Sequence, residues 1–194
     1  MIELDALQRY ARRASTRHAP LACELCMAPI AEEHRHVFDV ADRKLLCTCQ
    51  ACTLVFDHDT GRLRAVSPDV RIVAAFDIEQ RATLRVPVGL AFFTRSSSLG
   101  RWVAIFPSPA GPTEAEVEED AARVLEERVV RDDIEALLVR TQRSGESECF
   151  VTPIDVCYEC VAALRTTWKG IGGGDEAHHA IDAIIDRLRA RGRS

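Results

Sequence analysis

The cysteines are the residues of this chain whose chemistry and spacing are typical of a functional site. Five of the eight lie between residues 23 and 52, where a hairpin-length spacer separates two Cys-x2-Cys pairs, Cys23/Cys26 and Cys49/Cys52. Each pair can place two sulfur atoms on one side of an ion, and two pairs complete a tetrahedral shell. We therefore predict that these four cysteines bind a metal. Zinc is the expected ion, and iron or an iron–sulfur cluster is the alternative, because thiolates suit all three.

A fifth thiol and two histidines leave the ligand set open. Cys47 could replace Cys49, and the displaced thiolate beside the ion would then be sensitive to oxidation or could exchange metal. His34 and His36 are two residues apart, so on a strand they share one face. They could be alternative ligands or could orient the ligands. A pair of exposed strand histidines is the competing interpretation.

The remaining cysteines are Cys149, Cys157 and Cys160. The spacing of Cys157 and Cys160 resembles a redox motif, so a thiol oxidoreductase is a third hypothesis. The pair lies inside a predicted helix rather than at its start, which favours ordinary core or surface cysteines. The glycine-rich segment 169–174 does not follow the order of a phosphate-binding loop. Since no stretch identifies an active site, we favour a protein that is not an enzyme.

Composition restricts the class of protein. The chain has 194 residues, of which 47% are hydrophobic and 28% charged, as in ordinary globular proteins. Its net charge of −5 argues against a nucleic-acid binder, which needs excess cations. No apolar run is long enough to cross a bilayer, and no secretory signal is present, so we expect a cytoplasmic protein. In a reducing cytoplasm, clustered cysteines are metal ligands more often than disulfides.

The elements that must position the first cysteine cluster follow from local patterns. Residues 2–14 have the apolar spacing of a helix. Residues 34–48 alternate and turn at Asp42, as in a β-hairpin. If 50–56 are helical, the unit is treble-clef-like, whereas an extended 49–56 would make a zinc ribbon.

The rest of the chain reads as an α+β body of antiparallel hairpins packed on helices. Strands are expected within 62–67 and 70–76, and hairpins from 87–96 with 101–108 and from 134–141 with 148–154. Helices are expected over 114–130, 156–168 and 176–191, the first opened by a capping box of Thr113 and Glu116. The predicted division is an N-terminal helix and linker (1–20), a metal-binding domain (21–60) and the body (61–194).

Several short segments of the sequence together resemble those of one family. In chain order they are CELC, EEHRHV, CTCQAC, PVGLAFF, FPSPAG, PIDVCY and WKGIGGG. The resemblance is to an uncharacterised bacterial family encoded beside high-affinity [NiFe]-hydrogenases of the actinobacterial type. It implies a hydrogenase subunit or maturation factor as protein partner, and it supplies no catalytic residues.

The expected function is therefore that of a metal-binding accessory protein. The resemblance places it in the assembly or maturation of a [NiFe]-hydrogenase, or makes it an auxiliary subunit. The alternative is a small iron-thiolate or iron–sulfur electron carrier that serves the same enzyme and uses the same cysteines.

Overall fold

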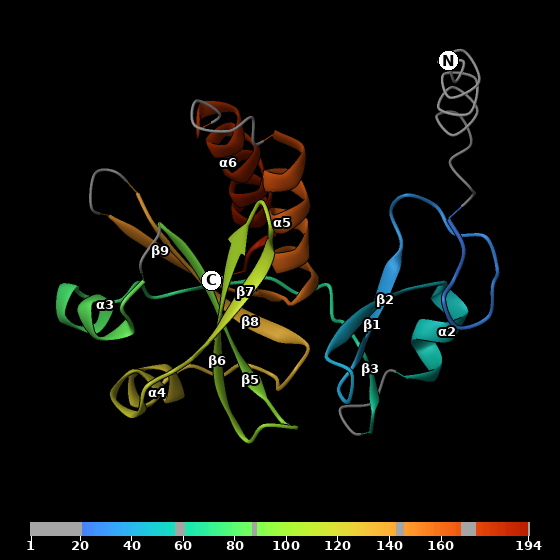
Figure 1. Ribbon diagram of the computed structural model, residues 1–194, viewed down its shortest axis with the longest axis horizontal. Helices are drawn as coiled ribbons and strands as arrows, with labels where there is room; N and C mark the ends of the chain where they lie inside the picture. Colours follow the sequence, from blue (N-terminus) through green and yellow to red (C-terminus); the bar gives the residue numbers. More distant parts are fainter. Residues whose placement is uncertain (1–20, 57–60, 87–88, 143–145, 168–173, 194) are drawn as a thin grey trace, which may run out of the picture.

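Two antiparallel sheets organise the molecule (Figure 1). The computed structural model describes residues 21–56, 61–86, 89–142, 146–167 and 174–193. The predicted helix over 2–14 and its linker lie outside the described residues, as does the glycine-rich segment except for Gly174. The mixed α+β class with antiparallel hairpins is confirmed.

The small sheet has the strand order β2-β1-β3 and carries the first cysteine cluster. Its elements are β1 (Arg35–Asp39), β2 (Lys44–Thr48), helix α2 (Gln50–Val55) and β3 (Leu63–Ala65). The predicted hairpin and the helix after it are both present, so the unit follows the treble-clef order of knuckle, hairpin and helix rather than that of a ribbon. Strand β3 pairs with β1, so the sheet takes its third strand from beyond residue 60.

The large sheet has the order β4-β9-β8-β5-β6-β7. Its strands are β4 (Arg71–Val73), β5 (Leu90–Ser96), β6 (Arg101–Ser108), β7 (Gly111–Glu116), β8 (Glu135–Thr141) and β9 (Ser147–Pro153). The helices are α3 (Ile78–Leu84), α4 (Glu119–Glu126), α5 (Asp155–Thr167) and α6 (Gly174–Arg191). Both predicted hairpins and the last two predicted helices are confirmed.

Helices cover both faces of this sheet, which explains its unbroken apolar runs. Neighbouring residues of one strand point to opposite faces. Leu138 packs with α5 and α6, in a core that contains Ile185 and Leu188. Leu137 packs on the other face, with Leu125 of α4. Figure 1 shows α5 and α6 side by side, with α3 and α4 apart from them.

The predicted helix over 114–130 is correct only for its middle part. Residues 111–116 form strand β7 at the sheet edge, paired with β6, and the helix spans only Glu119–Glu126. Glu114 and Glu116 instead pair with Arg43 and Arg101, respectively, whereas Glu119 and Asp120 do lie in the first turn of α4. Hairpin pairing with β6 thus overrides the capping signal at Thr113 and Glu116.

The small sheet is attached to the body by packing and by ion pairs. Phe38 and Val66 belong to the same buried cluster as Leu138. Arg64 of β3 lies 2.9 Å from the buried carboxylate of Asp133, which also accepts a hydrogen bond from the backbone N–H of Ser97. Figure 1 shows the small sheet beside the large one. A water-sized cavity of about 10 Å³ lies at this junction, lined by Phe38 of the small sheet and by Ile105 and Ile154 of the body.

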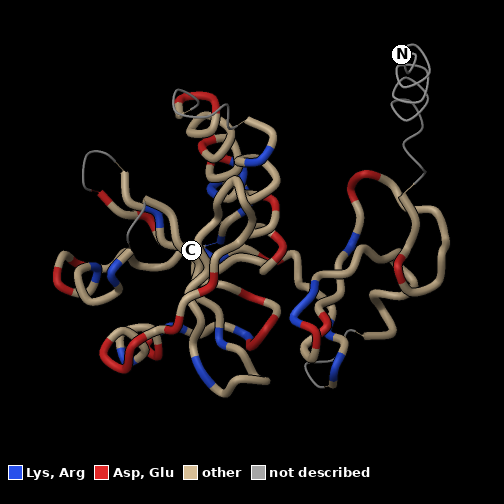
Figure 2. The backbone as a smooth tube through the Cα atoms, in the orientation of Figure 1, with Lys and Arg blue, Asp and Glu red and all other residues tan. Residues whose placement is uncertain are grey.

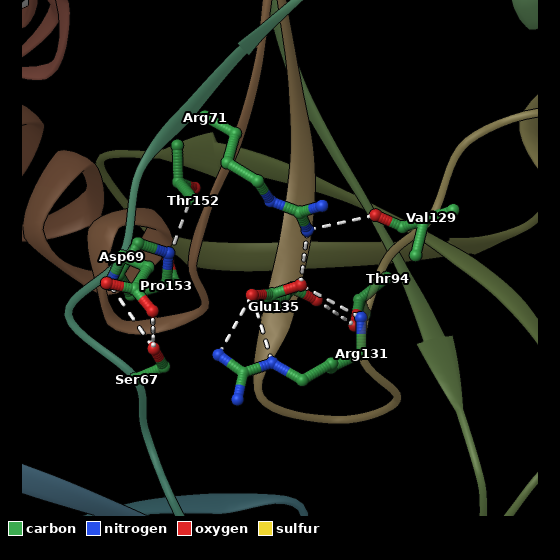
Figure 3. Close-up of polar contacts among 9 residues, drawn as sticks. All are labelled: Ser67, Asp69, Arg71, Thr94, Val129, Arg131, Glu135, Thr152 and Pro153. Carbon is green, nitrogen blue, oxygen red and sulfur yellow. Dashed lines mark hydrogen bonds and ion pairs between the residues drawn. The ribbon is translucent and has the colours of Figure 1, made fainter. Parts of the chain in front are cut away.

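A buried carboxylate organises the start of β8. Glu135 is 2% exposed and binds two arginines, Arg71 and Arg131, as well as the backbone N–H of Arg131 (Figure 3). Arg71 comes from β4, so this network ties the edge strand to the segment that enters β8.

Within the part of the chain that the structure describes, no helix has the length and apolar character needed to cross a membrane.

Asp39 closes the β1–β2 hairpin, and its charge should make the small sheet sensitive to acid. Hydrogen bonds from Arg62, and from the backbone N–H groups of Asp42 and Ala41, lower the pKa of this carboxyl. A lowered pKa means that the stabilisation is complete above the unfolded pKa of about 3.9 and is lost as the pH falls toward the folded value. We expect Asp39→Asn to cost about 1 kcal/mol at pH 7, and the difference from wild type to shrink toward pH 2.

Urea unfolding of both proteins at matched pH measures this difference. Asp42→Asn is the control, because Asp42 shares Arg62 but its side chain is 67% exposed, so its loss should have a smaller effect. A constant difference between wild type and Asp39→Asn from pH 7 to pH 2 would contradict the assignment.

Candidate metal centre

The first half of the centre is a tight turn at Cys23–Cys26. The N–H of Met27 donates to the carbonyl of Cys23, and the N–H of Cys23 donates to the carbonyl of Ala28. Met27 has a φ of 63°, the left-handed conformation that reverses the chain. Cys23 is fully buried and Cys26 is exposed, so the turn directs one thiol inward and leaves the other at the surface.

The second half is the start of α2. Cys49 is the N-cap residue of this helix, and its sulfur accepts a hydrogen bond from the N–H of Cys52. The buried hydroxyls of Thr48 and Thr53 hydrogen-bond each other at 2.9 Å beneath this turn. The helix start is thereby fixed against the end of β2, which positions the second thiol pair.

The two halves meet in space. The thiols of Cys23, Cys26, Cys49 and Cys52 all lie within 4.8 Å of one another, and the sulfur atoms of Cys26 and Cys49 are 3.7 Å apart. These four close cysteines could bind a metal ion. They are the four that spacing singled out, and they come from the turn and from the N-terminus of α2.

Cys47 and the two histidines lie in a different group. The ligand atoms of His34, His36 and Cys47 are also within 4.8 Å of one another. Cys47 is the direct partner of His36 across the β1–β2 ladder, so their side chains share a face of the small sheet. The structure therefore assigns the surplus thiol to the histidines rather than to the four-thiol cluster.

The sequence matches the family of unknown function DUF5947 over residues 22–192. The chain belongs to the DUF5947 family. No curated protein and no solved structure matches it. The DUF5947 match starts next to Cys23 and ends after α6, so the family unit includes both the cysteine cluster and the body.

Electrostatics within this DUF5947 cluster favour the thiolate of Cys23 and disfavour that of Cys52. Burial opposes ionisation of Cys23, but the backbone N–H groups of Cys49, Leu25 and Cys26 outweigh it and lower the pKa to about 6. Contacts with the sulfur atoms of Cys26 and Cys49 raise the pKa of Cys52 to about 12. Four adjacent thiolates repel one another, and a bound dication would relieve that repulsion and release protons.

The other cysteines of the chain lie in the core of the body. Cys157 and Cys160 are at most 1% exposed, on the inner face of α5. Burial raises the pKa of both thiols, that of Cys160 to about 12. Since the thiolate is the reactive form, these groups are poor nucleophiles, and their packing is that of small apolar residues. Cys149 is buried on the opposite face of the sheet, and burial likewise raises its pKa.

Two carboxylates beside the cysteines were missed by sequence reasoning. Glu24 accepts a 2.6 Å hydrogen bond from the N–H of Cys47 and pairs with Lys44, which ties the first turn to β2. Asp155, at the start of α5, lies 2.9 Å from Nδ1 of His36. Glu24 lies between two predicted ligands, Cys23 and Cys26, so the sequence could have indicated that its side chain lies near the site. Asp155 is remote in sequence, and only the packing of α5 reveals its role.

Proposed function

We propose that this chain is a non-enzymatic, cytoplasmic accessory protein in which a zinc ion holds together the four-cysteine unit beside the body. The observation that carries the proposal is the convergence of four thiols from two separate turns. Four protein ligands close the coordination shell of zinc and leave no position for a substrate, which is the arrangement of structural zinc sites. Cys23, Cys26, Cys49 and Cys52 would hold the ion.

The sulfur geometry and the surrounding donors support this ligand set. Zinc–sulfur bonds of about 2.3 Å in a tetrahedron put neighbouring sulfur atoms about 3.8 Å apart. The 3.7 Å separation of Cys26 and Cys49 agrees with that edge. The backbone N–H groups directed at Cys23 would also stabilise a metal-bound thiolate. Bound zinc would supply folding free energy to a unit with only three short strands and a six-residue helix.

The partner we propose is a protein of a [NiFe]-hydrogenase system, either an enzyme subunit or a maturation factor. The sequence phrases described above are the support for that identity. Four exposed apolar side chains give the four-cysteine unit a surface suited to a protein partner: Leu21, Met27, Leu54 and Val55. Figure 2 shows little charge along α2. Co-purification of tagged protein with hydrogenase components from its host tests this identity, and recovery without them in a host that expresses the hydrogenase would count against it.

Metal analysis of protein purified without oxygen tests the proposed ion. We expect one strongly held zinc per chain and no visible absorbance, because zinc has a filled d shell. Iron in the same thiolates would give charge-transfer colour and would replace the accessory role with that of an electron carrier. Protein expressed with both metals supplied in equal amounts provides the control for availability. A coloured product with stoichiometric iron from that culture would overturn the zinc assignment.

A further inference from the structure

A second cluster of metal-ligand residues lies on the small sheet, outside the four-thiol centre. His34, His36 and Cys47 bring two imidazoles and one thiol within 4.8 Å of one another. The two histidine rings are 4.8 Å apart between centroids and meet edge to face. His36 and Cys47 are direct partners in the β1–β2 ladder, and His34 lies two residues before His36. Sheet register therefore sets the positions of His36 and Cys47, and His34 directly precedes β1.

Hydrogen bonds fix which ring atoms are available. Nδ1 of His34 lies 2.8 Å from the carbonyl oxygen of Glu32 and 3.0 Å from that of Ala31, so it must carry a proton and donate it. Nδ1 of His36 lies 2.9 Å from a carboxylate oxygen of Asp155. In both rings, Nε2 is then the nitrogen whose lone pair can bind a metal ion.

The Nε2 atom of His34 is buried and has no hydrogen bond within the described part of the chain to offset its loss of contact with water. Its Nε2 has no hydrogen-bond partner among the described residues, although it is shielded from solvent. An unpaired buried polar atom costs about 1–3 kcal/mol, so native proteins rarely retain one without a reason. A ligand bond to a metal would satisfy this atom.

Asp155 supplies a further feature of built metal sites. A histidine ligand usually donates its other ring N–H to a carboxylate, which fixes the ring orientation and strengthens the donor atom. Asp155 stands in that relation to His36, and it comes from α5 of the body rather than from the small sheet. The cluster therefore has orienting partners for both histidines: backbone carbonyls for His34 and a carboxylate for His36.

We propose that His34, His36 and Cys47 form a second metal site, which binds one divalent transition ion through two imidazole nitrogens and one thiolate. Three protein ligands leave a coordination position open for water or an exogenous ligand, unlike the closed four-thiol centre. The mixed nitrogen and sulfur donors suit zinc, cobalt or copper rather than magnesium or calcium. A surface groove lined by residues 29–31, 33–35 and 48–50 reaches His34 and gives access to this region.

Cobalt titration of the purified full-length protein, with its strongly held metal in place and under reducing anaerobic conditions, tests the site. We expect one further equivalent of Co²⁺ to bind, with thiolate-to-cobalt charge-transfer absorbance. Cys47→Ser should remove that absorbance. His34→Asn, which keeps a donor for the local carbonyls but lacks Nε2, should weaken binding by on the order of 100-fold or more. Asp155→Asn, which alters only the orienting group, should weaken it about 10- to 100-fold.

His179→Ala, which removes an exposed histidine of α6, is the matched control and should bind cobalt as wild type does. The metal present before titration reports on the four-thiol centre, and the added cobalt reports on the second site. The two measurements therefore distinguish failure of the proposed zinc centre from failure of the second site. Wild-type protein that takes up no cobalt beyond that metal overturns the second site. The same conclusion follows if His34→Asn and Cys47→Ser, with wild-type circular dichroism, bind cobalt as tightly as wild type.

Discussion

Replacing Cys23 with serine should remove the strongly held metal and unfold the four-cysteine unit. Cys23 is fully buried, and backbone N–H groups of Cys49, Leu25 and Cys26 stabilise its thiolate. Structural zinc sites in small domains contribute about 10–16 kcal/mol of apparent binding free energy, most of which is folding free energy. Loss of one of four ligands should therefore be the largest effect of any single substitution in this chain.

Metal content and hydrogen exchange together measure this loss. We expect Cys23→Ser to retain less than about a tenth of the wild-type metal after dialysis against a chelator, since each 1.4 kcal/mol is tenfold in affinity. Amides of the β1–β2 hairpin should exchange faster, whereas those of β8, inside the large sheet, should remain protected. Chelation of wild-type protein should reproduce the same pattern.

Cys47→Ser is the matched control for this prediction, because Cys47 lies in the same unit but outside the four-thiol cluster. It should keep the strongly held ion. If Cys47→Ser loses that ion while Cys23→Ser keeps it, the ligand set drawn from the geometry is wrong.

Glu135→Ala should destabilise the body by about 3 kcal/mol. Its carboxylate is 3% exposed and receives hydrogen bonds from the side chains of Arg71 and Arg131, at 2.9 to 3.1 Å, and from the N–H of Arg131 (Figure 3). Removing one partner of a buried ion pair costs about 3–5 kcal/mol because the remaining charge is left unpaired. The two arginine side chains are 40% and 39% exposed and can be hydrated, which places the effect at the lower end.

Urea unfolding provides the measurement for this second prediction. Glu135→Gln should cost less than the alanine variant, since its amide oxygen can still accept from the N–H of Arg131. Glu119→Ala is the control: this side chain is 81% exposed and pairs with Arg123 along α4, so its removal should cost no more than about 0.5 kcal/mol. Equal effects of Glu135→Ala and Glu119→Ala would show that burial does not govern the strength of this ion pair.

Much of the fold could be predicted because its signals are local. The β5–β6 and β8–β9 hairpins are alternating or apolar runs separated by turn residues, and α6 follows a regular apolar stripe. For residues 111–116, the local pattern gave a wrong prediction. Their acids and the Thr113/Glu116 spacing favour a helix start, but pairing with β6 and ion pairs to Arg43 and Arg101 make them an edge strand. Arg43 is 71 residues from Glu114, and the capping spacing within 113–116 does not contain the pairing with β6 that makes this segment a strand.

For the candidate site, the sequence alone determined which residues could bind a metal, because a Cys-x2-Cys turn is a local structure whose spacing fixes its sulfur pair. Spacing favoured Cys49 and left Cys47, two residues away, as an alternative ligand. Tertiary structure decided this. Cys47 lies inside β2 opposite His36, whereas Cys49 lies beyond the strand end and caps α2, so the two thiols belong to different clusters. The register of the β1–β2 ladder places Cys47 beside His36, and this pairing separates the four-thiol cluster from a neighbouring group of two histidines and one cysteine.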